Sequence, residues 1–213
     1  MKSKIGGIRN SYSGDHLDPT NVSGNPIHQF HTWFQEVINA NVTEPTAMTL
    51  ATVSDGMPSA RIVLLKDYNK NGFTFYTNYL SQKAKEIENN PNAALLFFWP
   101  QLSRQIRIRG RLDKLPYSVS ADYFNSRPEG SKVSAWVSPQ SSVIENRASL
   151  ENKYADFEKE HKQKNIVCPN FWGGYLLTPI EFEFWQGQAD RLHDRVQYIL
   201  EKNNKWIINR LAP

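Results

Sequence analysis

The sequence has a single cysteine, Cys168, among its 213 residues, so no intrachain disulfide can form. Free thiols are typical of reducing compartments. Nor does the sequence contain a run of about 18 apolar residues, the minimum for a membrane-spanning helix. The first residues lack the apolar segment of a signal peptide. We therefore expect a cytoplasmic protein without a membrane span.

A strong charge of one sign is also missing. Lys and Arg number 25 against 21 Asp and Glu, giving a formal charge of +4, and the basic residues are dispersed. A nucleic-acid-binding domain usually concentrates them on one face, so no nucleic-acid partner is predicted. The G-x-S-x-G, G-x-x-x-x-G-K-[ST] and G-x-G-x-x-G motifs are absent. His28 and His31 share a helix face, but no metal-binding pattern surrounds them, and we predict no metal.

What the sequence does contain is material for a core, since 39% of its residues are hydrophobic and 12% aromatic. Residues 1–24 are polar and rich in turn formers, which predicts a mobile N-terminal arm. Asn25-Pro26 then has the pattern of a helix start. An apolar face follows at helical spacing. It consists of Phe30, Trp33, Phe34, Val37 and Ile38.

Beyond the first helix, the hydrophobic period shortens toward two, as in strands. Asn71-Gly72 predicts a hairpin turn between the second and third strands, and Asn203-Asn204 a turn between the last two. The expected strands are Met48 to Val53, Ala60 to Lys66, Phe73 to Thr77, Ala93 to Trp99, Gln105 to Leu112, Gly174 to Leu177, Phe182 to Gln186, Val196 to Leu200 and Trp206 to Arg210.

Three further helices are expected, one capped by Ser81 and ending at Ile87, one from Pro116 to Phe124, and one capped by Ser142 that reaches about His161. Many short strands without strand–helix alternation favour a mainly β fold, an antiparallel barrel with flanking helices. We expect one domain over residues 25–213, with a small helical lobe at about 116–165.

Two strands carry cations at informative positions. Arg61 and Lys66 end one strand, point to opposite faces and lie roughly 16 Å apart at their Cα atoms. They could serve two different anions or be solvated strand ends. In the strand Gln105 to Leu112, the side chains of Gln105, Arg107 and Arg109 share a face with Arg111. That face is either a phosphate- or RNA-binding stripe or a basic surface paired with carboxylates.

A second group of polar residues lies near the end of the Pro116 helix. Tyr123, Arg127 and Ser131 are spaced by four and four, so consecutive helical turns place the first two on one side. The two hydroxyls and the guanidinium are suited to a phosphate monoester. A surface stack of Tyr123 on Arg127 explains the spacing equally well.

The run Arg191-Leu192-His193-Asp194-Arg195 forms a third group. An extended backbone puts Arg191, His193 and Arg195 on one face, where their charges favour an anion or an electron-rich ring. Neutralisation by Asp194 and nearby glutamates is the structural alternative. The upstream segment Phe182 to Gly187 offers aromatic surface, either core or a platform for a flat cofactor.

In order and spacing, these segments resemble the pyridoxamine 5'-phosphate oxidase family. The resemblance runs from about residue 26 to Pro213, with a weaker match from Arg9 to Tyr12. The motifs that carry it are R-I-V-L-L-K, F-Y-T-N, S-x-K-A, Q-I-R-I-R-G, Y-F-x-S-R-P, A-W-V-S-x-Q-S-S, F-W-G-G, E-F-W-Q-G and R-L-H-D-R, followed by N-R-L-A-P. It implies an FMN-binding split barrel that works as a homodimer, with FMN at the subunit interface.

The resemblance also implies roles for individual residues. Arg61 and Lys83 would meet the FMN phosphate, and Arg191 and His193 would cover the substrate ring as the catalytic pair. The full FMN set is Arg61, Ile62, Val63, Leu64, Leu65, Lys66, Tyr76, Thr77, Gln82, Lys83, Gln105, Gln140, Ser141, Trp185 and Arg195. The substrate set is Arg9, Tyr12, Lys66, Tyr123, Arg127, Ser131, Arg191 and His193.

One position departs from the family pattern, because Gln82 stands where an arginine is common. A neutral contact in place of a charged one is expected to weaken FMN binding by ~1 kcal/mol or more. Activity should persist, since Arg61 and Lys83 remain.

The implied reaction is oxidation of pyridoxine 5'-phosphate and pyridoxamine 5'-phosphate to pyridoxal 5'-phosphate, by hydride transfer from the substrate's 4-prime carbon to flavin N5. Dioxygen is the electron acceptor and hydrogen peroxide the product, with ammonia from the amine, as in vitamin B6 salvage and biosynthesis. Two alternatives are a split-barrel flavoenzyme with another substrate, which predicts loss of the Tyr123, Arg127 and Ser131 set, and a carrier or sensor that binds ligand without turnover.

Overall fold

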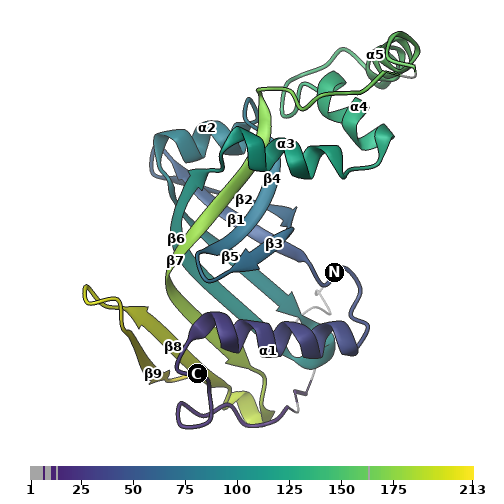
Figure 1. Ribbon diagram of the computed structural model, residues 1–213. Coiled ribbons are helices and arrows are strands. Elements are labelled where there is room, and N and C mark those ends of the chain that lie inside the picture. Colours follow the sequence, from purple (N-terminus) through teal and green to yellow (C-terminus); the bar gives the residue numbers. More distant parts are fainter. Residues whose placement is uncertain (1–6, 8–10, 13, 163) are drawn as a thin grey trace. The chain divides into compact units, whose positions relative to one another are not determined.

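The computed structural model describes residues 7, 11–12, 14–162 and 164–213 (Figure 1). Arg9, a predicted substrate residue, lies outside the described residues. The elements are α1 (Pro26–Asn39), β1 (Ala47–Ser54), β2 (Met57–Leu64), β3 (Asp67–Asn69), β4 (Gly72–Asn78), α2 (Gln82–Asn89), β5 (Asn92–Trp99), the short 3-10 helix η2 (Pro100–Leu102), β6 (Arg104–Lys114), α3 (Tyr117–Asn125), α4 (Glu129–Val137), α5 (Arg147–Glu160), β7 (Trp172–Gln186), the 3-10 helix η3 (Ala189–Arg191), β8 (Asp194–Leu200) and β9 (Trp206–Leu211).

The described strands follow the order β2-β1-β5-β6-β7-β4-β3, with β8 paired to β7 and β9 to β8. The β3–β4, β4–β7, β7–β8 and β8–β9 pairs are antiparallel. The chain divides into two compact units, and several strands contribute to both. The first comprises Met1–Leu50, Ala94–Gly110 and Pro179–Pro213, and the second Ala51–Ala93 and Arg111–Thr178.

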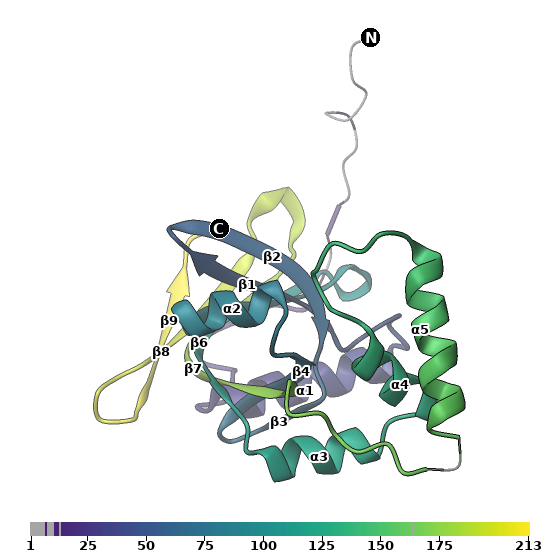
Figure 2. The same cartoon turned by 90° about the horizontal axis from the view of Figure 1, so that it is seen from above.

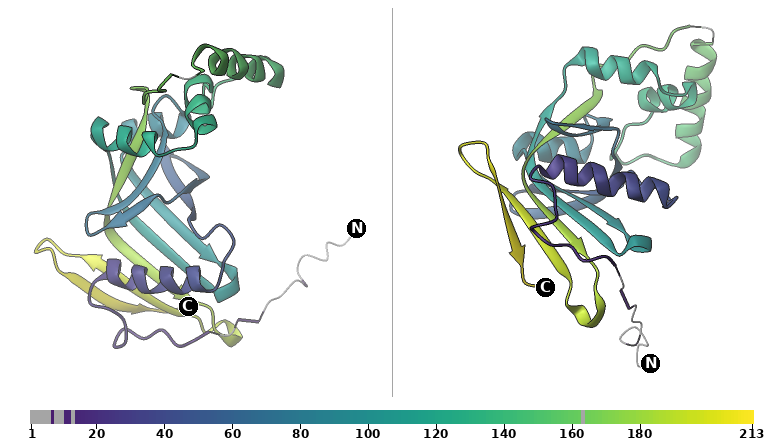
Figure 3. Two further views of the ribbon diagram at one scale, coloured as in Figure 1. Left: turned by 45° about the vertical axis from the view of Figure 1, so that its right-hand side comes forward. Right: turned by 60° about the horizontal axis from the view of Figure 1, so that its bottom comes forward.

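In the first unit, α1 packs on the sheet through aromatic side chains (Figures 1 and 3). The Phe30 ring lies 5.3 Å from that of Phe97, and the Trp33 ring 5.3 Å from that of Phe184. Asn25 caps the helix by accepting a hydrogen bond from the Ile27 amide, as its sequence predicts. The predicted apolar face is confirmed except at its end, because Ile38 is 42% exposed.

In the second unit, α3, α4 and α5 surround a small core. Its buried residues are Phe124, Val133, Ile166, Cys168 and Trp172. Figure 2 shows α4 and α5 side by side. The prediction that Ser142 caps α5 is wrong. Asn146 does so, accepting from the Ser149 amide, and Val143 lies outside the helix, fully exposed.

Two strand predictions need correction. Gly174 to Leu177 and Phe182 to Gln186 are parts of one 15-residue strand, β7, despite Pro179. Strand β4 pairs with residues 172–177 of β7 and β8 with residues 181–186, so the proline falls between the two ladders. The proline therefore removes no amide hydrogen from either of these two ladders.

The predicted hairpin at Asn71-Gly72 exists, but it joins β3 to β4, with Asn69 opposite Gly72. Strand β2 ends earlier, at Leu64. The turn between β1 and β2 contains Asp55 and Gly56, both at positive φ, 51° and 76°. Aspartate followed by glycine favours such tight turns, a signal in the sequence that the prediction overlooked. The Asn203-Asn204 turn between β8 and β9 is confirmed, with Asn204 at φ 61°.

Candidate functional site

A half-buried lysine marks the first polar cluster, which lies in the second unit. The Lys83 Nζ donates to Gln140 Oε1 at 2.9 Å and lies 3.3 Å from Thr77 Oγ1 and 3.4 Å from Ser81 Oγ. Burial lowers the pKa of Lys83, and the charge of Arg61 lowers it further. The cluster thus joins the end of β4, the start of α2 and the loop after α4 around a cation without a carboxylate contact among the described residues. We call it the Lys83 cluster.

Beside it, Arg61 on β2 is held by a buried carboxylate. Its Nη2 lies 2.7 Å from Glu86 Oε2 and 2.5 Å from Ser59 Oγ, and its Nη1 2.5 Å from Thr52 Oγ1. Burial alone would raise the pKa of Glu86, but hydrogen bonds from Thr52, Arg61 and Gln82 outweigh it and lower that pKa. Gln82, where an arginine was expected, donates to Glu86 Oε1 at 3.2 Å. Glu86 therefore offsets one of the two cations predicted to meet a phosphate.

The rest of the predicted strand motif is largely apolar and accessible. Ile62 is 64% and Leu64 38% exposed, Val63 is intermediate and Leu65 is buried. Lys66 is exposed beyond the end of β2, and its amide donates to the Thr74 carbonyl at 2.9 Å.

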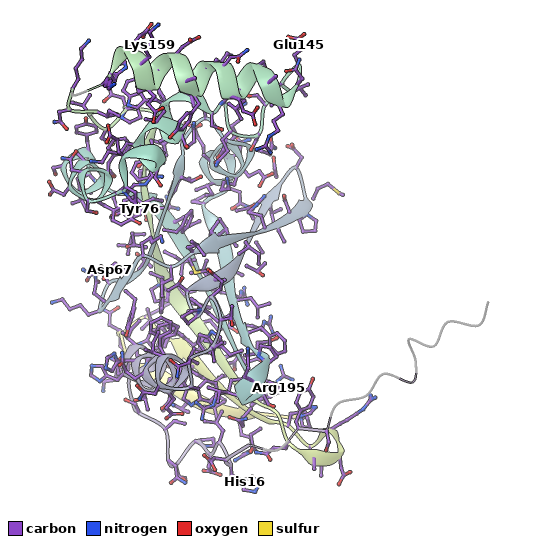
Figure 4. All side chains as sticks on the ribbon, turned by 90° about the vertical axis from the view of Figure 1, so that its right-hand side faces the viewer. His16, Asp67, Tyr76, Glu145, Lys159 and Arg195 are labelled. Carbon is purple, nitrogen blue, oxygen red and sulfur yellow. The ribbon has the colours of Figure 1, made fainter. Side chains whose placement is uncertain are left out.

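An aromatic stack forms the second feature of this unit. The Tyr76 ring, labelled in Figure 4, stacks on Tyr123 at 4.0 Å and on Trp172 at 5.4 Å. The Arg127 guanidinium lies over the Trp172 ring, 4.6 Å from its centroid. Burial raises the pKa of Tyr76 to about 12, so its hydroxyl stays protonated at neutral pH. Tyr123 and Arg127 are thus brought to one aromatic surface.

Tyr123 and Arg127 are not brought together by one continuous helix, as was predicted. Helix α3 ends at Asn125, and Pro128 separates it from α4, on which Ser131 lies. The inference that consecutive turns of one helix carry Tyr123 and Arg127 is wrong, because the residue before a proline is disfavoured in helical conformation. Shared contact with Trp172 brings them together instead.

The F-W-G-G motif explains how these rings approach the strand. A Cβ on Gly174 would lie 2.8 Å from Tyr76 Cε1 and 2.6 Å from a Leu115 methyl carbon. A Cβ on Gly173 would lie 2.3 Å from the Tyr79 hydroxyl oxygen. Both positions therefore need glycine for close packing rather than for an unusual backbone conformation.

A pocket of about 190 Å³ opens beside the stack. Arg127, Trp172 and Gln140 are among the residues that line it. Its lining residues are Asn78, Arg127, Ser134, Ala135, Ser138, Gln140 and Trp172. The predicted substrate residue Arg127 and the predicted FMN residue Gln140 thus face one pocket. Ser141, next in the chain, is exposed at φ 70°.

In the first unit, three predicted residues form an aromatic cluster. The Tyr12 ring packs edge-on against Trp185 at 5.5 Å and against His193 at 5.6 Å, and the Trp185 and His193 rings are 4.7 Å apart. The Gln188 amide donates to His193 Nδ1 at 3.0 Å. This bond requires a lone pair on Nδ1, so in the neutral ring the proton sits on Nε2. A Cβ on Gly187 would lie 2.8 Å from Tyr12 Cγ. Because glycine has no Cβ, the Tyr12 ring can pack closely against the backbone at residue 187.

Arg195 on β8 is paired with a carboxylate. Its Nε donates to Glu183 Oε1 at 2.9 Å, and its Nη1 to the Ala212 carbonyl at 2.7 Å. Glu183 is buried and also accepts from Arg107 at 2.8 Å. Gln105 is half-buried on the same strand as Arg107.

Of the two interpretations of the basic face of β6, the structure supports the one in which its arginines pair with carboxylates. Arg107 pairs with Glu183, Arg109 with Glu181 at 2.8 Å, and Arg111 with Asp113 at 3.5 Å. A stripe whose charges are matched in this way offers little attraction for a polyanion.

The run from Arg191 to Arg195 is not extended throughout, which corrects the one-face prediction. Arg191 lies in η3 at φ 63°, after Asp190 at φ 54°, and is exposed. Asp194 does not neutralise its arginine neighbours. It accepts from Arg210 at 2.9 Å and from the Leu17 amide at 3.1 Å, which ties the N-terminal segment to β8.

Two residues of this arrangement were missed in the sequence. Glu86 lies four residues after Gln82, a helical spacing that places it on the same side of α2, and a carboxylate there was a readable signal. Trp172 belongs to the F-W-G-G motif, for which no role at the site was predicted. Among the described residues no cluster of His, Cys, Asp and Glu has the arrangement of a metal site, and no helix is long and apolar enough to cross a membrane.

Comparison with known proteins gives the family of the chain. Residues 34–160 match the family described as pyridoxamine 5'-phosphate oxidase, and residues 172–213 match the pyridoxine 5'-phosphate oxidase C-terminal dimerisation region. Pyridoxine/pyridoxamine 5'-phosphate oxidases of Aliarcobacter butzleri and Rippkaea orientalis are 49% and 48% identical to the chain. The alignments cover 97% and 98% of the chain and 98% and 99% of those proteins.

Among solved structures, PhzG from Burkholderia lata in complex with tetrahydrophenazine-1-carboxylic acid superposes with a TM-score of 0.88 at 29% identity, covering 94% of this chain and all of that one. A pyridoxamine 5'-phosphate oxidase-related FMN-binding protein from Nostoc punctiforme gives a TM-score of 0.73 at 17% identity, covering 90% of this chain and all of that one. The chain is thus a mainly antiparallel split β-barrel with flanking helices, which confirms the predicted fold class. Within that class, it belongs to the pyridoxamine 5'-phosphate oxidase family, as its motifs predict.

Proposed function

We propose that the protein is an FMN-dependent oxidase that converts pyridoxine 5'-phosphate and pyridoxamine 5'-phosphate to pyridoxal 5'-phosphate. Dioxygen is the electron acceptor, hydrogen peroxide a product, and ammonia a further product from the amine. The observation that carries the proposal is that one unit holds two cationic groups, each suited to a phosphate. They are the Lys83 cluster and Arg127 beside Tyr123.

The residues present fit the phosphate of FMN. Burial and, after it, the charge of Arg61 lower the pKa of Lys83, so a phosphate dianion there would relieve an existing electrostatic cost. Thr77 and Gln140 contact the same amine. Arg61, Lys83 and Glu86 together carry a formal charge of +1, which a dianion overcompensates only modestly.

When bound, the flavin would supply the redox chemistry, and the protein's own groups would bind and orient the substrate. Arg127 and Tyr123 would hold the substrate phosphate, together with Lys66 and Ser131. Arg191 and His193 would orient and polarise the pyridine ring. The neutral tautomer that we infer for His193 leaves its Nε2 hydrogen available for donation.

We further propose a cytoplasmic homodimer in which residues 1–24 act as an arm over the substrate. The matched dimerisation region contains Trp185 and Arg195, both in the predicted FMN set, which supports a role for the partner subunit at the site. Tyr12 already contacts His193. The single cysteine, Cys168, is buried and unpaired, as suits a reducing compartment.

The purified protein should be yellow and should form pyridoxal 5'-phosphate aerobically from both phosphorylated vitamers, with stoichiometric peroxide. A colourless protein without this activity would refute the proposal. Bound ligand without oxygen consumption would favour a carrier, and turnover only of substrates without a phosphate would favour a different flavoenzyme.

A narrower test separates the two groups of residues. Arg191→Ala should lower turnover by roughly a hundredfold, because an orienting and polarising group is lost, while FMN affinity changes by less than about twofold. The matched control is Arg109→Ala, an exposed arginine on β6 that is paired with Glu181. Release of FMN by Arg191→Ala, with substrate binding intact, would contradict the division of the sites.

A further inference from the structure

The structure holds its arginines in two different ways. Arg61 and Arg195 are paired with buried or nearly buried glutamates. Arg127 has no carboxylate partner among the described residues, and its Nη1 is buried without a hydrogen-bond partner there. Burial lowers the pKa of Arg127, so its position carries an electrostatic cost.

Aromatic faces take the place of a counterion. The Arg127 guanidinium lies 4.6 Å from the Trp172 ring centroid and 5.6 Å from that of Phe124. A cation over an aromatic face is stabilised by the ring quadrupole, most strongly over Trp. Such a contact leaves the N–H donors of the guanidinium free of competing acceptors and its charge uncompensated.

The indole is itself rigidly held. Trp172 is 7% exposed, and its ring is nearly parallel to Tyr76 at 12° and to Tyr123 at 6°. Phe124 packs edge-on against it at 5.2 Å. The ring therefore sets the position of Arg127 relative to Tyr123, and both Arg127 and Trp172 line the pocket described above.

We propose that Trp172 is a positioning residue that holds Arg127, uncompensated, for the phosphate monoester of the substrate. This inference rests on the proposed function. A glutamate in that place would also fix Arg127, but it would cancel the charge that a dianion needs. Selectivity for phosphorylated substrates thus depends on a residue that acts through the guanidinium.

The test compares Trp172→Leu, which removes the aromatic face under the Arg127 guanidinium, with Trp172→Phe, which keeps an aromatic face with a weaker cation–π interaction. In the FMN-loaded enzyme the KM for pyridoxine 5'-phosphate should rise about tenfold for Leu and about threefold for Phe, with kcat nearly unchanged. Calorimetric affinity for 4-deoxypyridoxine 5'-phosphate, which is not oxidised, should fall by the same factors. The control is Trp136→Leu, because Trp136 packs on the same core but stacks on Phe157 rather than on Arg127.

Adding Trp172→Phe to Arg127→Gln should produce no further loss of affinity, because the indole acts through the guanidinium. An equal loss in both backgrounds, or unchanged affinity in Trp172→Phe, would overturn the inference. If Trp172→Leu does not fold, the Phe variant and this cycle decide the question. Wild-type enzyme that neither binds 4-deoxypyridoxine 5'-phosphate nor oxidises the vitamers would instead refute the proposed function.

Discussion

Replacing Glu86 by glutamine should change stability and FMN affinity in opposite directions. The Glu86 side chain is 5% exposed and accepts from Arg61 at 2.7 Å, Thr52 at 2.5 Å and Gln82 at 3.2 Å. Removing one partner of a buried ion pair typically costs 3–5 kcal/mol. Because glutamine keeps one acceptor oxygen and Arg61 is partly solvated, we expect a loss of about 2–4 kcal/mol in the free energy of unfolding.

The effect on FMN follows from the same charge. With Glu86 neutral, the formal charge of the group Arg61, Lys83 and Glu86 rises from +1 to +2. A unit charge and a dianion about 10 Å apart interact by about 3.3 kcal/mol at an effective dielectric constant of about 20. After screening, we expect FMN to bind about tenfold more tightly, equivalent to about 1.4 kcal/mol.

Urea denaturation of the FMN-free protein, followed by tryptophan fluorescence, gives the first quantity, and titration of flavin fluorescence gives the second. Glu88→Gln is the matched control, since Glu88 is exposed on the same helix. A fall in both stability and FMN affinity for Glu86→Gln would refute the reasoning, because Glu86 would then serve the site rather than oppose the phosphate.

Two further outcomes follow from packing and from charge. Gly174→Ala should lower the free energy of unfolding by about 1–3 kcal/mol, because its Cβ would lie 2.8 Å from Tyr76 Cε1. Gly24→Ala is the control, because a Cβ there would meet no atom of the described residues within 4 Å. Equal unfolding midpoints for the two variants would contradict this packing. Burial alone would raise the pKa of Asp194, but hydrogen bonds, first from the Leu17 amide, outweigh burial and lower that pKa. The ionised Asp194 carboxylate therefore stabilises the fold above about pH 4, and this stabilisation is lost as the pH falls through the lower folded-state pKa. Amide exchange of Leu17, corrected for intrinsic rate, should therefore accelerate in acid, whereas protection unchanged from about pH 5 to 3 would count against the link.

Local chemistry determined much of this molecule from the sequence. The period-two strands, the Asn25 cap of α1 and the turns at Asn71-Gly72 and Asn203-Asn204 were sufficient to predict an antiparallel barrel with flanking helices. The collinear motifs predicted its family by resemblance. The strands, the cap and the turns depend on neighbours a few residues apart, where backbone sterics and side-chain periodicity act directly. The same reasoning failed where capping choices compete, as at Ser142 and Asn146.

Tertiary structure decided which charges are compensated. The sequence shows arginines at 61, 127 and 195 without distinguishing them. Folding places Glu86 against Arg61, Glu183 against Arg195, and the Trp172 ring against Arg127. These partners are 25, 12 and 45 residues away in sequence, beyond the range of local pattern. Whether a carboxylate offsets a cation depends on their distance and burial in the folded chain. For that reason only the tertiary structure reveals which arginine has no carboxylate beside it, among the described residues, and is available to an anionic ligand.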